Sequence, residues 1–193
     1  MEQLPRVVVA EDESIIRMDL VESLRAAGCD VVGEAGDGET ALALIRGRLP
    51  DVALLDIQMP GRDGLQVAEQ VLDEGLCAVV MVTAFSQRSL VDRATEAGAL
   101  GYLVKPVQPS DLLPAIAVAR AQFATMQQLR GRIVDLEEQL ATRKIMDRAK
   151  SILQRTQGLD EAAAFRWLQK AAMDRRLTMR EVAESVLRST AQN

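Results

Sequence analysis

Short apolar runs alternate with amphipathic stretches over the first part of the chain, residues 1–124. Runs such as VVV, VALL and AVVMV are almost continuously apolar, as is typical of parallel strands covered on both faces. The stretches between them carry apolar residues at helical spacing. This pattern predicts strands at 6–10, 30–34, 52–56, 78–82 and 100–104, and helices at about 14–27, 38–47, 64–74, 87–97 and 110–124. Five such repeats with short connections predict an α/β fold with a doubly wound, five-stranded parallel sheet.

The pattern changes from about residue 110, where a narrow apolar stripe follows steps of three and four residues. Charged and amide side chains surround the stripe. The simplest interpretation is one long helix that leaves the first domain and continues as a coiled-coil-like segment to about residue 141. The alternative is a helix that lies on its own domain. The stripe consists of Leu112, Ile116, Ala119, Phe123, Met126, Leu129, Ile133, Leu136 and Leu140.

Three more helices are predicted at about 142–156, 161–173 and 179–190. Gly158 suits the end of the first helix, and Asp160 suits the cap of the second. Thr178 and Glu181 form the capping-box pattern at the start of the third. A unit of this size supports only a small core. The residues expected in that core are Ile145, Ala149, Ile152, Leu153, Phe165, Leu168, Ala172, Val182, Ala183 and Val186.

Composition narrows the class of protein. The chain has no apolar run of the ~20 residues needed to span a membrane, and its N-terminus lacks the layout of a signal peptide. We therefore expect a cytoplasmic protein without membrane association. Cys29 and Cys77 should be reduced, since their spacing fits no metal site and disulfides are rare in that compartment. The absence of histidine excludes Ser-His-Asp and Cys-His catalysis and every His-containing metal site.

Charge is distributed unevenly along the chain. Residues 1–124 contain 10 Lys and Arg against 19 Asp and Glu, whereas residues 125–193 contain 13 against 9. Only the second segment is suited to a polyanionic partner, although mildly basic helices are also common without one.

Chemically distinctive residues occur where the predicted strands end. Glu11 and Asp12 follow the first strand, Asp56 closes the third, Thr83 closes the fourth, and Lys105 closes the fifth. The carboxyl ends of parallel strands meet at one edge of the sheet, so these side chains should converge. Three carboxylates repel one another unless a cation joins them, and a hard, oxygen-preferring ion such as Mg²⁺ suits this set. Lys105 adds a positive charge that can pair with a carboxylate or a phosphoryl oxygen.

In this combination, residues 5–121 resemble the receiver domain of two-component response regulators, which has a flavodoxin-like fold. The resemblance also implies a cis peptide bond before Pro106. The residues that carry it are Glu11, Asp12, Asp56 within LLDIQMPGRDG, Thr83, and Lys105 within YLVKP.

The resemblance implies a phosphorylation site. Asp56 would accept a phosphoryl group from the phosphohistidine of a sensor histidine kinase. Mg²⁺ would be held by the acidic pair, Asp56 and the backbone carbonyl of Gln58, and Lys105 would neutralise charge on the transferring oxygens. The hydroxyl of Thr83 would then move toward the phosphoryl group, and Tyr102 would turn inward behind it.

Residues 141–187 resemble the ANTAR domain of transcription antiterminators. A receiver, a coiled coil and an ANTAR domain in this order resemble the phosphorylation-dependent antitermination regulators of actinobacteria, which implies binding to paired stem-loops in nascent RNA. The chain would divide into a receiver domain at 1–121, a coiled-coil linker at 122–141 and an RNA-binding ANTAR domain at 142–193. The strongest matches are Ala149, Lys150, Ile152, Leu153, Gly158, Leu159, Ala163, Phe165, Leu168, Val182 and Ala183.

Lys and Arg side chains would contact RNA phosphates, and hairpin loops offer unstacked bases. Lys144, Arg148 and Arg155 fall near one helical face and form the most coherent subset. Trp167 would either stack on a base or pack against the bundle. The full set of candidates is Arg143, Lys144, Arg148, Lys150, Arg155, Arg166, Lys170, Arg175, Arg176 and Arg180.

We therefore predict an RNA-binding regulator that phosphorylation activates, through dimerisation along residues 126–140, since two RNA loops fit two copies of the module. A DNA-binding regulator is an alternative, although no recognition helix is evident. A module that sequesters a protein partner is another. No enzyme is expected, because the GxxxxGK, GxGxxG and nucleophile-elbow motifs are absent from the sequence.

Overall fold

The computed structural model describes residues 4–84 and 99–190, so the helix predicted at 87–97 lies outside the described residues. The chain divides into two compact units, Met1–Gln128 and Leu129–Asn193. Among the described helices, none is both long and apolar enough to cross a membrane.

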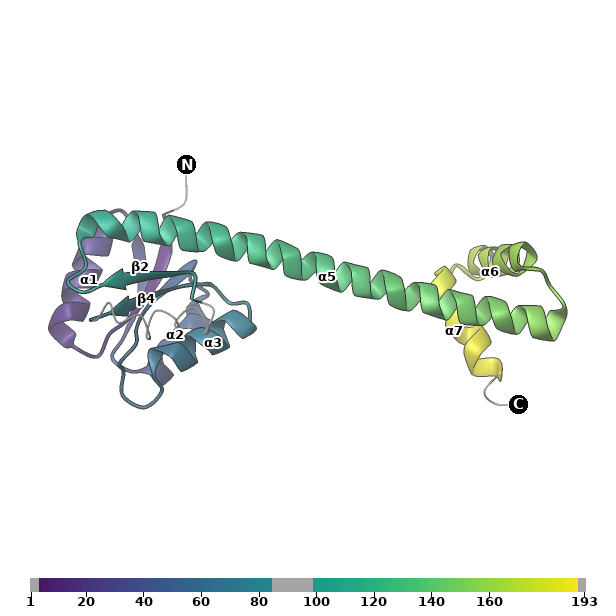
Figure 1. Ribbon diagram of the computed structural model, residues 1–193, viewed down its shortest axis with the longest axis horizontal. Helices are drawn as coiled ribbons and strands as arrows, with labels where there is room; N and C mark the ends of the chain where they lie inside the picture. The colour runs from purple at the N-terminus through teal and green to yellow at the C-terminus, as the bar shows by residue number, and fades with distance from the viewer. Residues whose placement is uncertain (1–3, 85–98, 191–193) are drawn as a thin grey trace. The chain divides into compact units, whose positions relative to one another are not determined.

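A five-stranded parallel sheet forms the centre of the first unit (Figure 1). Its order is β2-β1-β3-β4-β5, which confirms the predicted doubly wound fold and places β1 beside β3. The strands are β1 (Arg6–Ala10), β2 (Asp30–Ala35), β3 (Val52–Asp56), β4 (Ala78–Thr83) and β5 (Gly101–Val104). The described helices between the strands are α1 (Ser14–Ala26), α2 (Gly38–Arg48) and α3 (Gly64–Asp73).

Helices cover both faces of the sheet, because alternate strand residues point to opposite sides. α2 and α3 pack on one face, where Ile45 is fully buried, and α1 and the beginning of α5 (Pro109–Gln157) pack on the other, where Ile116 is buried. β3 and β4 are buried along their whole length, as their continuous apolar runs predicted. Cys29 and Cys77 are buried free thiols.

α5 is a single helix, so the predicted division into one helix ending near 141 and another starting at 142 is wrong. The sequence has no Gly or Pro between residues 132 and 157, and nothing there interrupts the helical hydrogen bonds. The apolar stripe has two environments. Its first residues are buried in the first unit, as the alternative interpretation expected, whereas later residues are 53–58% exposed. The exposed stripe residues are Leu129, Ile133, Leu136 and Leu140.

A small apolar core joins the end of α5 to α6 (Glu161–Arg175) and α7 (Met179–Thr190) in the second unit. The predicted core residues are buried or half-buried with one exception: Phe165 is 44% exposed, and its assignment to the core was wrong. Leu168 faces the core, and the residue one turn before it on the same face is Ala164. Phe165 follows Ala164 directly and therefore lies about 100° around the helix from the core-facing position of Ala164.

The helix boundaries of the second unit follow the predicted caps. Gly158 has a φ of 67°, which suits a residue that ends a helix. The Asp160 carboxylate accepts a hydrogen bond from the backbone N–H of Ala163 at 2.6 Å. The backbone N–H of Thr178 donates to the Glu181 carboxylate at 2.7 Å, and the N–H of Glu181 donates to the Thr178 hydroxyl at 3.2 Å. The predicted capping box is confirmed.

Candidate functional site

The polar residues predicted at the strand ends converge on one edge of the sheet. β1, β3, β4 and β5 are successive neighbours, so the residues that follow them lie in one row along the carboxyl edge. They surround a pocket of about 120 Å³. The pocket is lined by Asp12, Glu13, Asp56, Ile57, Gln58, Thr83, Ala84 and Lys105.

Lys105 is the cation of this site. Its backbone N–H donates to the carbonyl of Thr83 at 2.8 Å, which holds the end of β5 beside β4. Its ammonium lies 2.6 Å from Oε2 of Glu11 and 3.2 Å from Oδ1 of Asp56, and the side chain is only 13% exposed. The peptide bond before Pro106 is cis, as predicted. One lysine thus contacts both buried carboxylates of the site.

The carboxylates form a set of oxygen ligands. Glu11 has no exposed surface, and its Oε1 accepts a hydrogen bond from the backbone N–H of Glu13 at 3.3 Å. Its Oε2 faces Lys105 as an ion pair but accepts no hydrogen bond of good geometry from the described residues. One oxygen each from Glu11, Asp12 and Asp56 lie within 4.8 Å of one another. Three carboxylate oxygens this close together, two of them on buried residues, form a hard oxygen set that fits Mg²⁺.

Burial governs the protonation of the site. Desolvation raises the pKa of Asp56 above its ordinary value, Lys105 opposes this, and the charge of Asp12 adds to it. The pKa of Glu11 is raised for the same reason, again against the effect of Lys105. Desolvation lowers the pKa of Lys105, but its contacts with Glu11 and Asp56 outweigh this and raise the pKa overall. A further cation would relieve the cost of the two buried carboxylates.

Arg17 on α1 holds the acidic pair in place. Its guanidinium donates hydrogen bonds to the backbone carbonyls of Glu11 and Asp12. No sequence signal marked Arg17, because an arginine on an amphipathic helix is ordinarily a solvated charge.

Gly64 allows the first turn of α3 to approach the end of β3. Its N–H donates to the carbonyl of Ile57 at 3.0 Å. A Cβ at this position would lie 1.9 Å from the carbonyl oxygen of Asp56, far inside van der Waals contact. Asp63 caps α3 in a capping box with Gln66. These contacts determine where the loop 57–63 leaves the strand.

Thr83 and Tyr102, the predicted switch residues, have different exposures. Thr83 closes β4, is 4% exposed and lines the pocket. Tyr102 lies on β5 and is 53% exposed. The movement of both residues on phosphorylation stays a prediction.

The basic candidates of the second unit have different surroundings. All of them except Lys150 are exposed. The ammonium of Lys150 lies 2.9 Å from Asp147 and 3.0 Å from Glu161, so it joins α5 to α6. Arg180 pairs with Glu184 at 3.0 Å. Lys150 therefore serves the packing of the unit, and the other candidates keep their side chains at the surface.

The two aromatic residues of α6 have different surroundings, and the packing alternative holds for Trp167. Trp167 is half-buried against the core, whereas Phe165, which precedes the basic residue Arg166 in the chain, is 44% exposed. Sequence reasoning missed Phe165 as a surface residue because its helical spacing also suited the core.

Two family profiles match the chain. The profile of the response regulator receiver domain matches residues 7–117, and that of the ANTAR domain matches residues 134–187. The chain belongs to the response regulator family. The ANTAR match begins within α5, so the last part of that helix lies in the ANTAR domain of this response regulator.

Individual relatives support both parts. The response regulator is 50% identical to the transcriptional regulatory protein PdtaR of Mycobacterium tuberculosis, over 94% of this chain and 89% of that protein. It is 42% identical to the transcriptional regulatory protein NarL of the same organism, over 58% of this chain and 52% of NarL. The solved signal receiver domain of NarL has a TM-score of 0.59 and 39% identity, and covers 62% of this chain and 98% of that domain. The likeness to PdtaR spans both matched domains.

Proposed function

We propose that this response regulator accepts a phosphoryl group on Asp56 from a sensor histidine kinase and then controls transcription antitermination by binding paired stem-loops in nascent RNA. The observation that carries the proposal is the pocket at Asp56, where one lysine contacts two buried carboxylates and oxygens of Glu11, Asp12 and Asp56 lie within 4.8 Å of one another. The ANTAR match and the likeness to a transcriptional regulatory protein support the output.

The pocket suits phosphoryl transfer to a carboxylate. An oxygen of Asp56 attacks the phosphorus of the donor phosphohistidine, the phosphorus–nitrogen bond breaks, and its electron pair leaves with the imidazole. Lys105, 3.2 Å from Oδ1, balances charge on the transferring oxygens. Glu11, Asp12, Asp56 and the carbonyl of Gln58 would hold Mg²⁺, which when bound neutralises phosphoryl charge.

Thr83 and Tyr102 would transmit the phosphorylation state. The Thr83 hydroxyl belongs to the pocket wall, so a short movement brings it to a phosphoryl oxygen. The inward turn of Tyr102 would then bury a ring that is half exposed before phosphorylation.

The RNA-binding face would lie on the exposed sides of α5 and α6. Arg166 and Lys170 are one turn apart on α6, and Phe165, which precedes Arg166 in the chain and is 44% exposed, would offer a stacking surface to an unstacked base. Arg148 and its neighbours on α5 would add phosphate contacts. We leave Lys150 out of this face because two carboxylates already hold it.

The exposed part of the stripe, residues 129–140, would form a dimer contact. Four large apolar side chains that are more than half exposed suit a coiled coil with a second copy. Met126, which was expected in the same contact, packs against the core of the first unit. We therefore propose a dimer interface that begins after Met126, within the linker assigned to 122–141.

RNA binding by wild type and Asp56→Asn, each with and without beryllofluoride, tests the proposed function. Beryllofluoride mimics the phosphoryl group, so it should raise the affinity of the wild type for a paired hairpin RNA and leave Asp56→Asn unchanged. Duplex DNA at the same salt concentration serves as the comparison, because salt strongly affects both affinities. Tighter binding to the duplex than to the hairpins would reject the RNA assignment.

Two matched substitutions on α5 test the dimer. Leu136 and Val118 are both exposed apolar residues of this helix, at 58% and 52%, but only Leu136 belongs to the stripe. Leu136→Gln should abolish any beryllofluoride-dependent doubling of mass in light scattering, and Val118→Gln should preserve it. Equal behaviour of the two variants would place the interface elsewhere.

A further inference from the structure

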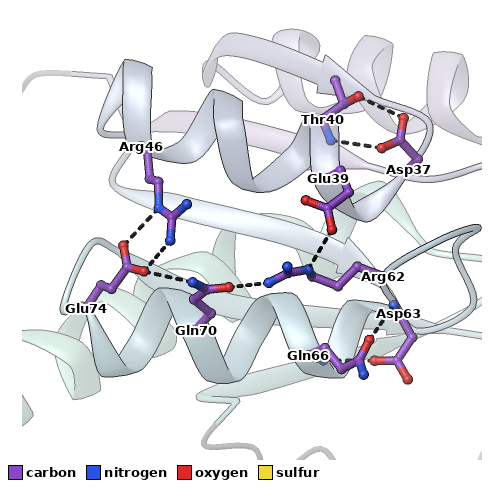
Figure 2. A network of polar contacts seen from close by, with 9 residues as sticks. All are labelled: Asp37, Glu39, Thr40, Arg46, Arg62, Asp63, Gln66, Gln70 and Glu74. Atoms are coloured by element: carbon purple, nitrogen blue, oxygen red, sulfur yellow. Dashed lines mark hydrogen bonds and ion pairs between the residues drawn. The ribbon is translucent and has the colours of Figure 1, made fainter.

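A continuous chain of polar side chains joins α2 to α3 beside the loop 57–63 (Figure 2). The guanidinium of Arg62 lies 3.1 Å from the carboxylate of Glu39 on α2 and donates a hydrogen bond to the side-chain oxygen of Gln70 on α3. The Gln70 amide donates to Glu74 at 3.1 Å, and Glu74 accepts two hydrogen bonds from Arg46 on α2. Two arginines thus bridge the same pair of helices at opposite ends of one network.

The two arginines differ in what they hold. Arg46 belongs to α2 and pairs with the residue that ends α3, so it links helix to helix. Arg62 belongs to neither helix. It lies in the loop that starts directly after Asp56, and its side-chain contacts tie that loop to α2 and α3 together.

The backbone of Arg62 is held as closely as its side chain. A Cβ at Gly38, the first residue of α2, would lie 2.1 Å from the carbonyl oxygen of Arg62, so the two backbones are in direct contact. Asp56, which precedes the loop, is in equally close backbone contact with Gly64, which follows it. Between these contacts lies Gln58, which lines the pocket and whose carbonyl would be a ligand of Mg²⁺ in the proposed function.

We propose that Arg62 is a positioning residue for the phosphoacceptor site. By fastening the loop 57–63 to α2 and α3, it sets the place of the Gln58 carbonyl relative to the Asp56 carboxylate, and so prepares the oxygen set for Mg²⁺. This inference rests on the proposed function. The physical reason is entropic: a loop already fixed does not have to be ordered when the metal binds.

The expected effect is moderate. Met59 is 7% exposed and keeps part of the loop in the core, so removal of the Arg62 side chain should loosen the loop, Gln58 included, only in part and leave the fold intact. Arg62→Ala should weaken Mg²⁺ binding about three- to tenfold, in proportion to a part-exposed ion pair and one hydrogen bond.

The matched control is Arg46→Ala, which breaks the same network without touching the loop. Mg²⁺ affinity is measured by titrating each full-length variant with MgCl₂ and following backbone amide NMR shifts at residues 11–12 and 56–58. Unfolding temperatures are recorded in parallel, because both variants lose a link between α2 and α3. Glu39→Gln, an exposed change, is added alone and together with Arg62→Ala.

Arg46→Ala should bind Mg²⁺ as the wild type does, and Arg62→Ala should bind it three- to tenfold more weakly. Glu39→Gln should weaken binding in the wild type and add nothing in the Arg62→Ala background, since both changes remove the same contact. Equal Mg²⁺ affinity of Arg62→Ala and the wild type overturns the positioning role but leaves the proposed function intact. Absence of Mg²⁺-dependent phosphorylation of Asp56 in the wild type overturns both.

Discussion

The exposure of Phe165 leads to a sharp prediction about α6. Phe165 and Leu168 are three residues apart on this helix, and both suit a core position by spacing. In the structure Leu168 has no exposed surface, whereas Phe165 is 44% exposed. Truncation of each side chain to alanine should therefore have different consequences for stability and for RNA binding.

The magnitudes follow from burial. Leu168→Ala leaves a cavity in the core of the second unit and should cost about 2–5 kcal/mol of the free energy of unfolding. Complete burial of a phenylalanine side chain is worth about 1.5–3 kcal/mol, and Phe165 has only a little more than half of its surface buried. Phe165→Ala should therefore cost about 0.8–1.7 kcal/mol.

Trp167 provides the assay. It is the only tryptophan of the chain and packs against the core of the second unit, so its fluorescence during urea unfolding reports on that unit alone. Phe165→Ala should keep a cooperative transition, whereas Leu168→Ala should shift the midpoint further. Equal destabilisation by the two variants would refute the orientation of α6.

The same Phe165→Ala variant tests the RNA face. Loss of one stacked base costs about 1–3 kcal/mol, so hairpin affinity should fall roughly fivefold or more under conditions in which the variant is folded. Unchanged affinity would remove Phe165 from the RNA contact and leave the basic residues as the only candidates.

Three further predictions concern the first unit. Lys105→Met should lower the free energy of unfolding, measured by calorimetry, by about 3 kcal/mol, because it leaves two buried carboxylates without their cation. MgCl₂ should restore part of this stability. An unchanged free energy of unfolding would contradict the ion pairs of Lys105 with Glu11 and Asp56. Hydrogen bonds from the backbone and hydroxyl of Thr40 lower the pKa of Asp37 below 3.8, so its cap stabilises α2 above that pH and is lost as the pH falls through the lowered value. Thr40→Val removes only the hydroxyl donor and should raise the pKa of Asp37 in an NMR titration. An unchanged pKa would show that the Thr40 hydroxyl does not lower it. Gly64→Ala should slow phosphorylation by a small-molecule donor at least tenfold, because the added Cβ would collide with the carbonyl oxygen of Asp56. In the control Gly47→Ala, the added Cβ meets open space on α2, so the rate should stay unchanged and the helix should gain up to about 1 kcal/mol. Equal rates in the two variants would refute the close approach of Gly64 to Asp56.

The strands, most of the helices and the residues at the strand ends could be predicted from the amino-acid sequence. The reason is that these features are local. A strand shows itself in a run of four to six apolar residues, and the cap at Asp160 and the capping box at Thr178 involve atoms only three residues apart. The ends of parallel strands must lie at one edge of the sheet, so Glu11, Asp56 and Lys105 could be brought together without coordinates.

The neighbours that each helix face meets could not be predicted in this way. Leu112 and Leu136 occupy the same stripe, yet only the first is covered by the sheet. Sequence reasoning did not mark Arg62 and offered Lys150 as an RNA contact, yet each has an ion-pair partner on another element, such as Glu39, 23 residues from Arg62. Burial and ion pairing depend on distances between segments that are remote in the chain, and helical periodicity carries no information about those distances.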